Sequence, residues 1–169
     1  RTRWTTEPLS RASGRSRLRA GTATDTTTYW ATMKFWKPAL PPVSSVLFVC
    51  MGNICRSPTA EVVFRDVAHR SGLGDTLHVD SAGTGDWHVG APPDRRAIQA
   101  ARRRGYDLAA LRARQVEVAD FVRFGWIFAM DQQNLRALEA MRPPQYPGHL
   151  GLFLALAPTM GIDEVPDPY

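Results

Sequence analysis

Residues 46–58 read VLFVCMGNICRSP, and this stretch predicts a strand, a short loop and a helix start in immediate succession. Val46 to Val49 is an unbroken apolar run rich in β-branched residues, typical of a strand buried on both faces of a parallel sheet. Ser57 and Pro58 predict a hydroxyl N-cap followed by proline at the first helical position. N–H groups and a helix dipole converge at such a junction and favour an anion. We therefore expect an α/β fold with a phosphate-binding loop after its first strand.

The loop opens with Cys50 and closes with Arg56, and this pair distinguishes it from nucleotide-binding loops. It lacks the Gly-Lys-Ser/Thr ending that nucleoside triphosphate loops carry. A thiolate is the nucleophilic form of cysteine, and it is favoured by N–H groups, a helix terminus and a nearby arginine. The same donors can hold phosphoryl oxygens, two of them through the planar fork of Arg56. The alternative is a buried cysteine and a solvated arginine on an ordinary strand-to-helix turn.

The spacing from Cys50 to Arg56, followed by Ser57, resembles the signature of cysteine-dependent protein tyrosine phosphatases. The fuller string VCMGNICRSP, residues 49–58, resembles the low-molecular-weight protein tyrosine phosphatase family. This resemblance implies hydrolysis of phosphotyrosine in proteins through a cysteinyl-phosphate intermediate, with no metal or other cofactor. It also implies a single domain with a four-stranded parallel sheet in the order 2-1-3-4 and helices on both faces.

Residues 165–169 read VPDPY and resemble the family's second signature, the loop that carries the general acid. They follow the last predicted strand, residues 150–156, as Cys50 follows the first, so both loops should emerge at the C-terminal edge of the sheet. By this resemblance, Asp167 protonates the leaving phenolic oxygen and later activates water, and Tyr169 contacts the substrate. An isolated Asp-Pro pair would otherwise indicate only a turn.

The resemblance also implies which groups bind the substrate. Ser57 would donate a hydrogen bond to the thiolate, and Asn53 would hold the loop. Trp87 lies in a glycine-rich loop over residues 81–90, and its family counterpart forms one wall of the active-site cleft; a packing role is the alternative. The residues expected to contact or position the substrate are Met51, Gly52, Asn53, Ile54, Cys55, Ser57, Trp87 and Tyr169.

Four helices and two strands are predicted between the first strand and the last, from apolar spacing and from Gly and Pro stops. The first helix is expected to end at residue 70, and the other three are expected to span 94–104, 118–124 and 131–141. The strands are expected over 77–81 and 126–130. Asp131 would cap its helix, and by resemblance it lies near the support of the phosphate loop. Leu111 stands in a segment where many relatives have His or Ser, so support of the loop must come from another group.

The chain is basic overall, with a net charge of +5, but residues 1–45 contribute +6 and residues 46–169 contribute −1. We therefore predict no nucleic-acid partner, because such a footprint needs positive charge clustered on a folded face. Residues 1–31 lack periodicity, which predicts disorder; a basic arm and a non-native segment both remain as interpretations. The expected organisation is a tail and linker over residues 1–45 and a phosphatase domain over 46–169, truncated before the C-terminal helix that relatives have.

The two cysteines lie in one loop, and no apolar run has transmembrane length. These features predict a reduced, cytoplasmic protein without a disulfide framework or a membrane partner. Cys55 is expected either to fill space beneath the loop or to act as a resolving thiol. In the second case oxidised Cys50 would form a disulfide with it, which would make the enzyme redox-sensitive.

Three alternatives to tyrosine phosphatase activity follow from the same loop. Arsenate reductases of this fold use further cysteines downstream, and none follows Cys55. Protein arginine phosphatases favour Thr where this chain has Ile54, an apolar residue suited to a phenyl ring. An inactive module that binds phosphopeptides is the third alternative. The sequence predicts two kinds of partner: phosphotyrosine proteins as substrates, and an oxyanion such as phosphate in the loop.

Overall fold

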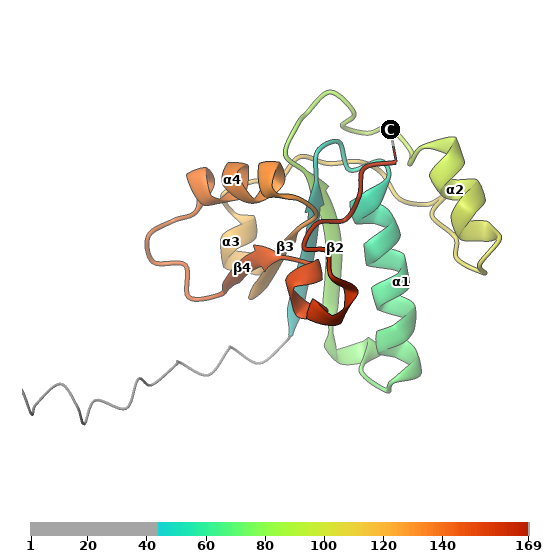
Figure 1. Cartoon of the computed structure of the whole chain (residues 1–169), viewed down its shortest axis with the longest axis horizontal. Helices are drawn as coiled ribbons and strands as arrows, with labels where there is room; N and C mark the ends of the chain where they lie inside the picture. The colour runs from blue at the N-terminus through green and yellow to red at the C-terminus, as the bar shows by residue number, and fades with distance from the viewer. Residues whose placement is uncertain (1–43, 169) are drawn as a thin grey trace, which may run out of the picture. The chain divides into compact units, whose positions relative to one another are not determined.

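The computed structural model describes residues 44–168, and its centre is a sheet of four parallel strands in the order β2-β1-β3-β4 (Figure 1). The strands are β1 (Ser45–Cys50), β2 (His78–Gly83), β3 (Trp126–Ala129) and β4 (His149–Leu152). In register, Cys50 lies opposite Gly83 and Val49 opposite Ala129, so β1 ends between its neighbours at the C-terminal edge. The predicted strand order and parallel sheet are confirmed.

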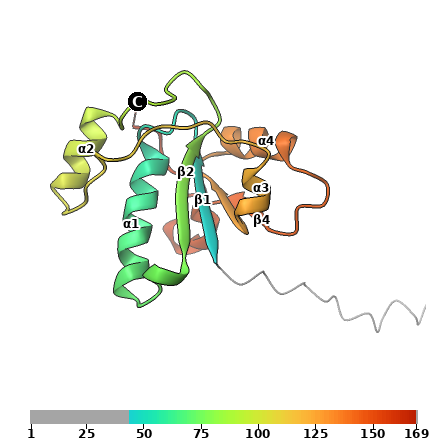
Figure 2. The same cartoon turned by 180° about the vertical axis from the view of Figure 1, so that it is seen from behind.

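Helices cover both faces of this sheet, as the front and back views show (Figure 2). The helices are α1 (Arg56–Arg70), α2 (Arg95–Arg102), α3 (Asp120–Arg123) and α4 (Gln132–Met141). The alternation along β1 explains the two layers: Leu47 and Val49 pack with residues of α3 and α4, whereas Val46 and Phe48 pack with residues of α1. Successive side chains of a strand point to opposite faces, and on β1 both faces are apolar.

Phe48 is the centre of the core on the α1 face. Its ring contacts the ring of Phe64 on α1 at 5.5 Å and that of Phe153 after β4 at 5.1 Å, centroid to centroid. Complete burial of an aromatic side chain stabilises a fold by about 1.5–3 kcal/mol. Because Phe48 is only two residues from Cys50, this packing fixes β1 firmly where the loop begins.

Several predicted element boundaries were wrong in detail: α2 ends at Arg102 rather than residue 104, and α3 spans Asp120–Arg123 rather than 118–124. β2 continues to Gly83, so the glycine-rich loop begins inside a strand. β4 ends at Leu152, and residues 154–156 form a 3₁₀ turn in place of the predicted strand. The backbone of Phe153 is helical, which turns its ring onto the Phe48 cluster, the group of buried side chains around Phe48 on the α1 face of the sheet. Leu156 stays exposed. Packing of the Phe153 ring therefore stabilises the domain more than further pairing of the edge strand β4 would.

Some predictions concern residues outside the described part of the chain. The expected disorder of residues 1–31, the tail and linker up to residue 43 and the substrate contact of Tyr169 all fall there. Within residues 44–168, none of the helices has the length and apolar composition needed to cross a membrane.

Candidate active site

The loop between β1 and α1 curls around the sulfur of Cys50, which is buried. The backbone N–H of Asn53 donates to Cys50 Sγ at 3.3 Å, and Ser57 Oγ lies 3.1 Å from the same sulfur. Asn53 has φ 53°, a left-handed backbone that asparagine tolerates better than most residues. The loop therefore directs two hydrogen-bonding groups at the sulfur of Cys50.

The carbonyl groups of the loop are bound from outside it. Thr84 N–H donates to the carbonyl of Cys50, and Gly85 N–H donates to that of Met51, each at 2.9 Å. Asp94 N–H donates to the carbonyl of Ile54 at 2.8 Å. In a trans peptide the N–H of the next residue points opposite to the carbonyl, so these bonds turn several N–H groups toward the inside of the loop. The result is a concave set of donors, the arrangement that binds an anion.

The prediction that Ser57 caps α1 was wrong. The helix begins at Arg56 with Cys55 as its N-cap residue, and no side chain caps it. Ser57 is fully buried, and its hydroxyl lies 3.1 Å from Cys50 Sγ and 3.2 Å from the carbonyl oxygen of Ala82. A hydroxyl directed at the sulfur cannot also reach the first-turn N–H groups. Those groups stay available to a ligand, which a capping serine would have prevented.

Asn53 is the residue that ties the loop to the rest of the domain. Its Nδ2 donates to Ser57 Oγ at 3.0 Å and to Ser81 Oγ at 2.9 Å. Its Oδ1 accepts from the backbone N–H of Arg114 at 2.9 Å. The support that Leu111 cannot give comes from this backbone group three residues later, because a backbone N–H is present whatever the side chain.

Behind Asn53 lies a buried carboxylate that the sequence did not single out. The hydroxyl of Ser81 donates to the carboxylate of Glu61 on α1, and Glu61 is only 2% exposed. The guanidinium of Arg65 contacts the same carboxylate at 2.9 Å. Burial raises the pKa of the Glu61 carboxyl above its ordinary value. A hydrogen-bonded chain therefore runs from Glu61 through Ser81 and Asn53 to Ser57 and the sulfur. Glu61 and Ser81 lie outside the sequence motif of the loop, so the motif alone does not reveal them.

Arg114 is held in place from the other side. Its guanidinium contacts Asp80 and the buried Asp120, each at 2.9 Å. Burial disfavours the charge of Arg114, but the hydrogen bonds and charges of Asp120 and Asp80 outweigh burial and raise its pKa. These contacts fix the backbone whose N–H supports Asn53.

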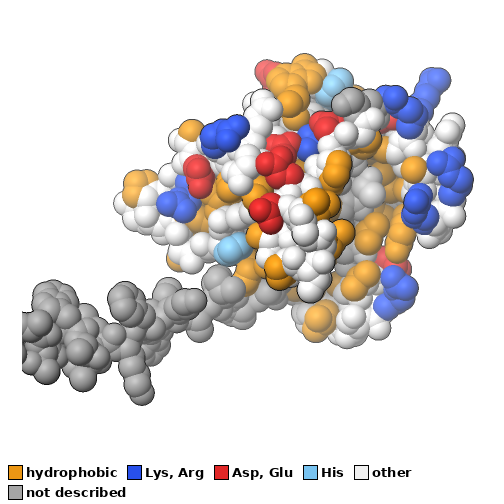
Figure 3. Space-filling model, in the orientation of Figure 1, with side chains coloured by type: hydrophobic (Ala, Val, Ile, Leu, Met, Phe, Trp, Pro, Cys, Tyr) orange, Lys and Arg blue, Asp and Glu red, His pale blue; other side chains and the backbone are white. Residues whose placement is uncertain are grey.

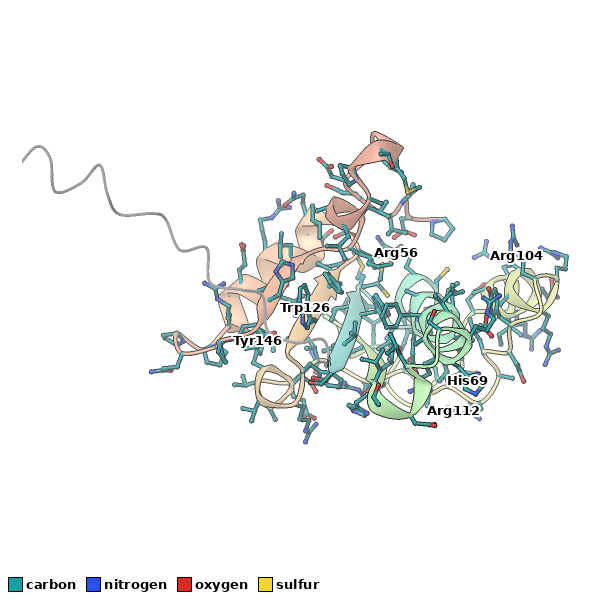
Figure 4. All side chains as sticks on the ribbon, turned by 90° about the horizontal axis from the view of Figure 1, so that it is seen from below. Arg56, His69, Arg104, Arg112, Trp126 and Tyr146 are labelled. Carbon is teal, nitrogen blue, oxygen red and sulfur yellow. The ribbon has the colours of Figure 1, made fainter. Side chains whose placement is uncertain are left out.

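Arg56 joins the loop to the C-terminal segment, and Figure 4 labels it where the start of α1 meets that segment. Its side chain is 6% exposed, and its Nη1 and Nη2 contact Asp131 Oδ2 at 2.6 Å and Asp167 Oδ2 at 2.8 Å. Asp131 also accepts from Asn134 N–H at 2.7 Å, so it caps α4 and holds Arg56 at once. The side chain of Asp167 is 45% exposed, so solvent reaches this contact.

The segment that carries Asp167 is anchored two residues earlier. Val165 N–H donates to the carbonyl of Met130 at 2.8 Å, and Val165 packs on the Phe48 cluster. The carbonyl of Val165 accepts from Arg56 Nη1 at 3.4 Å. These contacts bring Asp167 to a residue 111 positions away in sequence.

These groups surround a pocket of about 190 Å³. It is lined by Cys50, Met51, Gly52, Ile54, Cys55, Arg56, Trp87, His88 and Asp167. Trp87 is 62% exposed at this pocket, a degree of exposure that a core-packing role does not explain. His88 was not predicted, and it packs against the loop at Gly52, where an added Cβ would meet its ring at 2.8 Å. Among residues 44–168, no group of three or more His, Cys, Asp or Glu side chains could hold a metal ion.

Comparison with known proteins gives consistent results. The family model for low molecular weight phosphotyrosine protein phosphatase matches residues 45–169. The chain is 50% identical over 128 residues to low molecular weight phosphotyrosine protein phosphatase 2 of Drosophila melanogaster, covering 75% of this chain and 76% of that protein. Its fold matches the crystal structure of a protein tyrosine phosphatase from Entamoeba histolytica with Hepes in the active site. The TM-score is 0.71 at 40% identity, and the match covers 74% and 80% of the two chains.

A crystal structure of an arginine phosphatase from Drosophila is also similar. The TM-score is 0.68 at 35% identity, and the match covers 73% of this chain and 80% of that one. Proteins described as tyrosine phosphatases and as an arginine phosphatase therefore share this fold.

Proposed function

Because the chain belongs to the low molecular weight phosphotyrosine protein phosphatase family, it is a cysteine-dependent protein-tyrosine phosphatase, and we propose that Cys50, Arg56 and Asp167 carry its reaction. One observation carries this assignment. Arg56, which closes the loop around Cys50, contacts Asp167 from the far end of the chain at 2.8 Å, and all three line one pocket. A nucleophile, a phosphate-binding cation and a carboxyl group thus meet at one point.

In the first step, the phosphoryl group enters the loop and its oxygens accept from the N–H groups and from Arg56. The guanidinium keeps its contact with Asp131, whereas the contact with the half-exposed Asp167 is exchanged for phosphate. Cys50 thiolate attacks phosphorus, and the bond to the phenolic oxygen breaks as Asp167 donates its proton to that oxygen. The products are the cysteinyl-phosphate and the dephosphorylated tyrosine side chain of the substrate.

In the second step, the carboxylate of Asp167 accepts a proton from water, and the water oxygen attacks phosphorus. The phosphorus–sulfur bond breaks, and inorganic phosphate leaves while Cys50 returns to the thiolate. Arg56 and the loop N–H groups bind the three equatorial phosphoryl oxygens in both steps, because the negative charge stays on these oxygens throughout.

Ser57 assists the departure of the sulfur. Its single hydroxyl hydrogen can be donated to Cys50 Sγ or to the carbonyl of Ala82, and the two distances are nearly equal, 3.1 and 3.2 Å. We infer that it turns to the sulfur when Cys50 is a thiolate and to the carbonyl when the sulfur is bound to phosphorus. The bond to Asn53 keeps the oxygen in position in both cases.

Phosphotyrosine is the substrate class that the pocket favours, because Ile54 and the exposed Trp87 offer apolar surface to a phenyl ring. We expect wild-type kcat/KM for a phosphotyrosine peptide to exceed that for the matching phosphoarginine peptide by roughly 10- to 200-fold, the range of one apolar pocket contact. Ile54→Thr should narrow this ratio. A wild-type preference for phosphoarginine would instead assign the chain to the arginine phosphatase class.

We also propose that the protein works in the cytoplasm on phosphotyrosine proteins, where a reducing environment keeps its thiols free. The catalytic role proposed for Cys50 requires a reduced sulfur, which supports this proposal. Other oxyanions should compete with phosphate for the loop, since the donors recognise charge and shape alone.

Cys55 is expected to protect Cys50 from irreversible oxidation. Peroxide converts the Cys50 thiolate to a sulfenic acid; attack by the Cys55 sulfur then forms a disulfide and releases water. After brief peroxide treatment, the wild type should lose two hydrogens in mass and regain most of its activity in dithiothreitol.

Cys55→Ser provides the comparison. This variant should retain substantial basal activity but recover poorly after the same treatment, because its sulfenic acid proceeds to irreversible forms. Equal recovery in both proteins would leave Cys55 as a residue that only fills space beneath the loop.

A further inference from the structure

The positive charge of the domain is concentrated on α2 and the turn after it. Residues 94–112 carry six arginines and two aspartates, a net charge of +4, whereas the rest of residues 46–169 carries −5. Figure 3 shows positive side chains gathered at the end of the domain where α2 lies. The near-neutral sum over the domain conceals this separation. The six arginines are Arg95, Arg96, Arg102, Arg103, Arg104 and Arg112.

A neighbouring carboxylate offsets one arginine of this cluster, since Arg96 contacts Asp94 at 3.4 Å. Within the described part of the chain, Arg102, Arg103 and Arg104 form no ion pair, although Arg104 donates to the carbonyl of Ala100 at 3.1 Å. All three side chains are exposed. Elsewhere in the domain, arginines such as Arg70 contact a carboxylate directly, at 2.6 Å in that case. The end of α2 therefore presents positive potential to whatever lies beside it.

A groove of about 390 Å³ lies between α1 and α2, with these arginines at its edge. Its lining includes small or apolar side chains, namely Val63, Ala97, Ala100 and Ala101. The polar lining includes Thr59, Arg96, Arg103, Arg104 and Tyr106. Small side chains keep the groove open, and the arginine stems can lie along its apolar surface with their charges in water. Figure 4 shows Arg104 on the α2 side, away from Arg56.

The groove begins where the active-site pocket ends. Cys55 lines both spaces, and Pro168, which follows Asp167, lines the groove. The hydrogen bond from Asp94 N–H to the carbonyl of Ile54, at 2.8 Å, fixes the start of α2 against the phosphate loop. A peptide whose phosphotyrosine enters the pocket therefore has a direct path into the groove.

We propose that this groove binds an acidic segment that flanks the phosphotyrosine of the substrate. The inference rests on the proposed function, because it extends the same site. Arg96 and Arg103 are about 10 Å apart along the helix axis at 1.5 Å per residue, a distance spanned by about three residues of an extended peptide. Two Asp or Glu residues about three positions apart in the flanking segment match these arginines.

The experiment compares three phosphotyrosine peptides of equal length whose flanking positions are acidic, neutral or basic, each made with the flank on either side. The proteins are the wild type, Arg103→Glu/Arg104→Glu, and Arg136→Glu/Arg142→Glu as a control with the same change of net charge on and after α4. The wild type should favour the acidic peptide over the neutral one by about 10-fold in kcat/KM, which is the combined effect expected of two or three exposed charge contacts. The α2 variant should lose this preference, and the control variant should keep most of it.

Hydrolysis of p-nitrophenyl phosphate, which has no flanking residues, should be unchanged in all three proteins. Failure of the wild type to hydrolyse this compound and the neutral peptide would overturn the proposed function itself. With that activity intact, equal rates on acidic and neutral peptides would overturn the groove proposal, as would equal losses in both charge-reversed variants. Loss of binding to phosphatidylserine vesicles in the α2 variant, without loss of peptide preference, would identify the arginines as a membrane-facing surface and also overturn it.

Discussion

Replacing Cys50 with Ser is expected to lower turnover of phosphotyrosine by more than roughly 10⁴-fold, the scale seen when a covalent nucleophile is removed. The hydroxyl is hardly ionised at neutral pH, so the hydrogen bonds that stabilise a thiolate would have no anion to act on. The Arg56 contacts with Asp131 and Asp167 do not involve the sulfur, and the substitution leaves the backbone N–H groups of the loop in place. Phosphate binding should therefore survive, which kinetic assays and the phosphate-induced rise in melting temperature can check together.

This second readout separates chemistry from folding. A Cys50→Ser protein that no longer binds phosphate would have lost its loop structure, and its inactivity would say nothing about the nucleophile. A protein that binds phosphate and retains more than about one per cent of wild-type turnover would contradict the role of Cys50. In that case the neighbouring Cys55 would be the group to examine.

Replacing Asp167 with Asn is expected to slow hydrolysis of a phosphotyrosyl peptide by roughly 10²–10⁴-fold, the usual contribution of general acid–base catalysis. Asparagine is close in size to aspartate, but it cannot donate a proton to the leaving phenolic oxygen. An activated aryl phosphate needs less protonation, so bond cleavage to its leaving group should suffer less. The first turnover of each substrate, measured by rapid mixing, reports this step alone.

Asp163→Asn is the matched control, because Asp163 is an exposed aspartate in the same C-terminal segment and does not line the pocket. Its rates should stay close to those of the wild type. Equal slowing of both substrates in Asp167→Asn would remove Asp167 from the role of general acid. It would then act only through its contact with Arg56.

The layout of the domain could be read from local patterns. The apolar runs that form β1 and β3 are buried on both faces, and Asp131 caps α4 as its position before the helix predicted. The meeting of Cys50 with Asp167 followed from parallel strands that end at one edge. Such features depend on periodicity and on strand direction, which the sequence carries.

Features that depend on three-dimensional competition could not be read in this way. Ser57 has the sequence position of a cap, but the sulfur and a strand carbonyl compete for its hydroxyl and bind it instead. The support of Asn53 comes from Ser81 and from the backbone of Arg114, groups 28 and 61 residues away. A backbone N–H leaves no residue preference that a reader of sequence could detect.

The arginines of α2 illustrate a third kind of limit. A cluster at the last turn suits the helix dipole, so its sequence alone predicts no more than a solvated helix end. Only the groove between α1 and α2, and its continuity with the pocket through Cys55, give the charge a place in substrate binding. Net charge over a domain likewise says nothing of how the charges are distributed on its surface.

Trapping of the cysteinyl-phosphate shows whether the phosphoryl group passes through the sulfur of Cys50. Asp167→Asn should form the intermediate readily from p-nitrophenyl phosphate, whose leaving group needs little acid, and should hydrolyse it slowly because the base for water is missing. Acid quenching followed by peptide mass spectrometry should find one phosphoryl group per chain on the peptide that contains Cys50. A phosphoryl group on another residue, or a burst of p-nitrophenol with no phosphorylated peptide, would show that Cys50 is not the nucleophile.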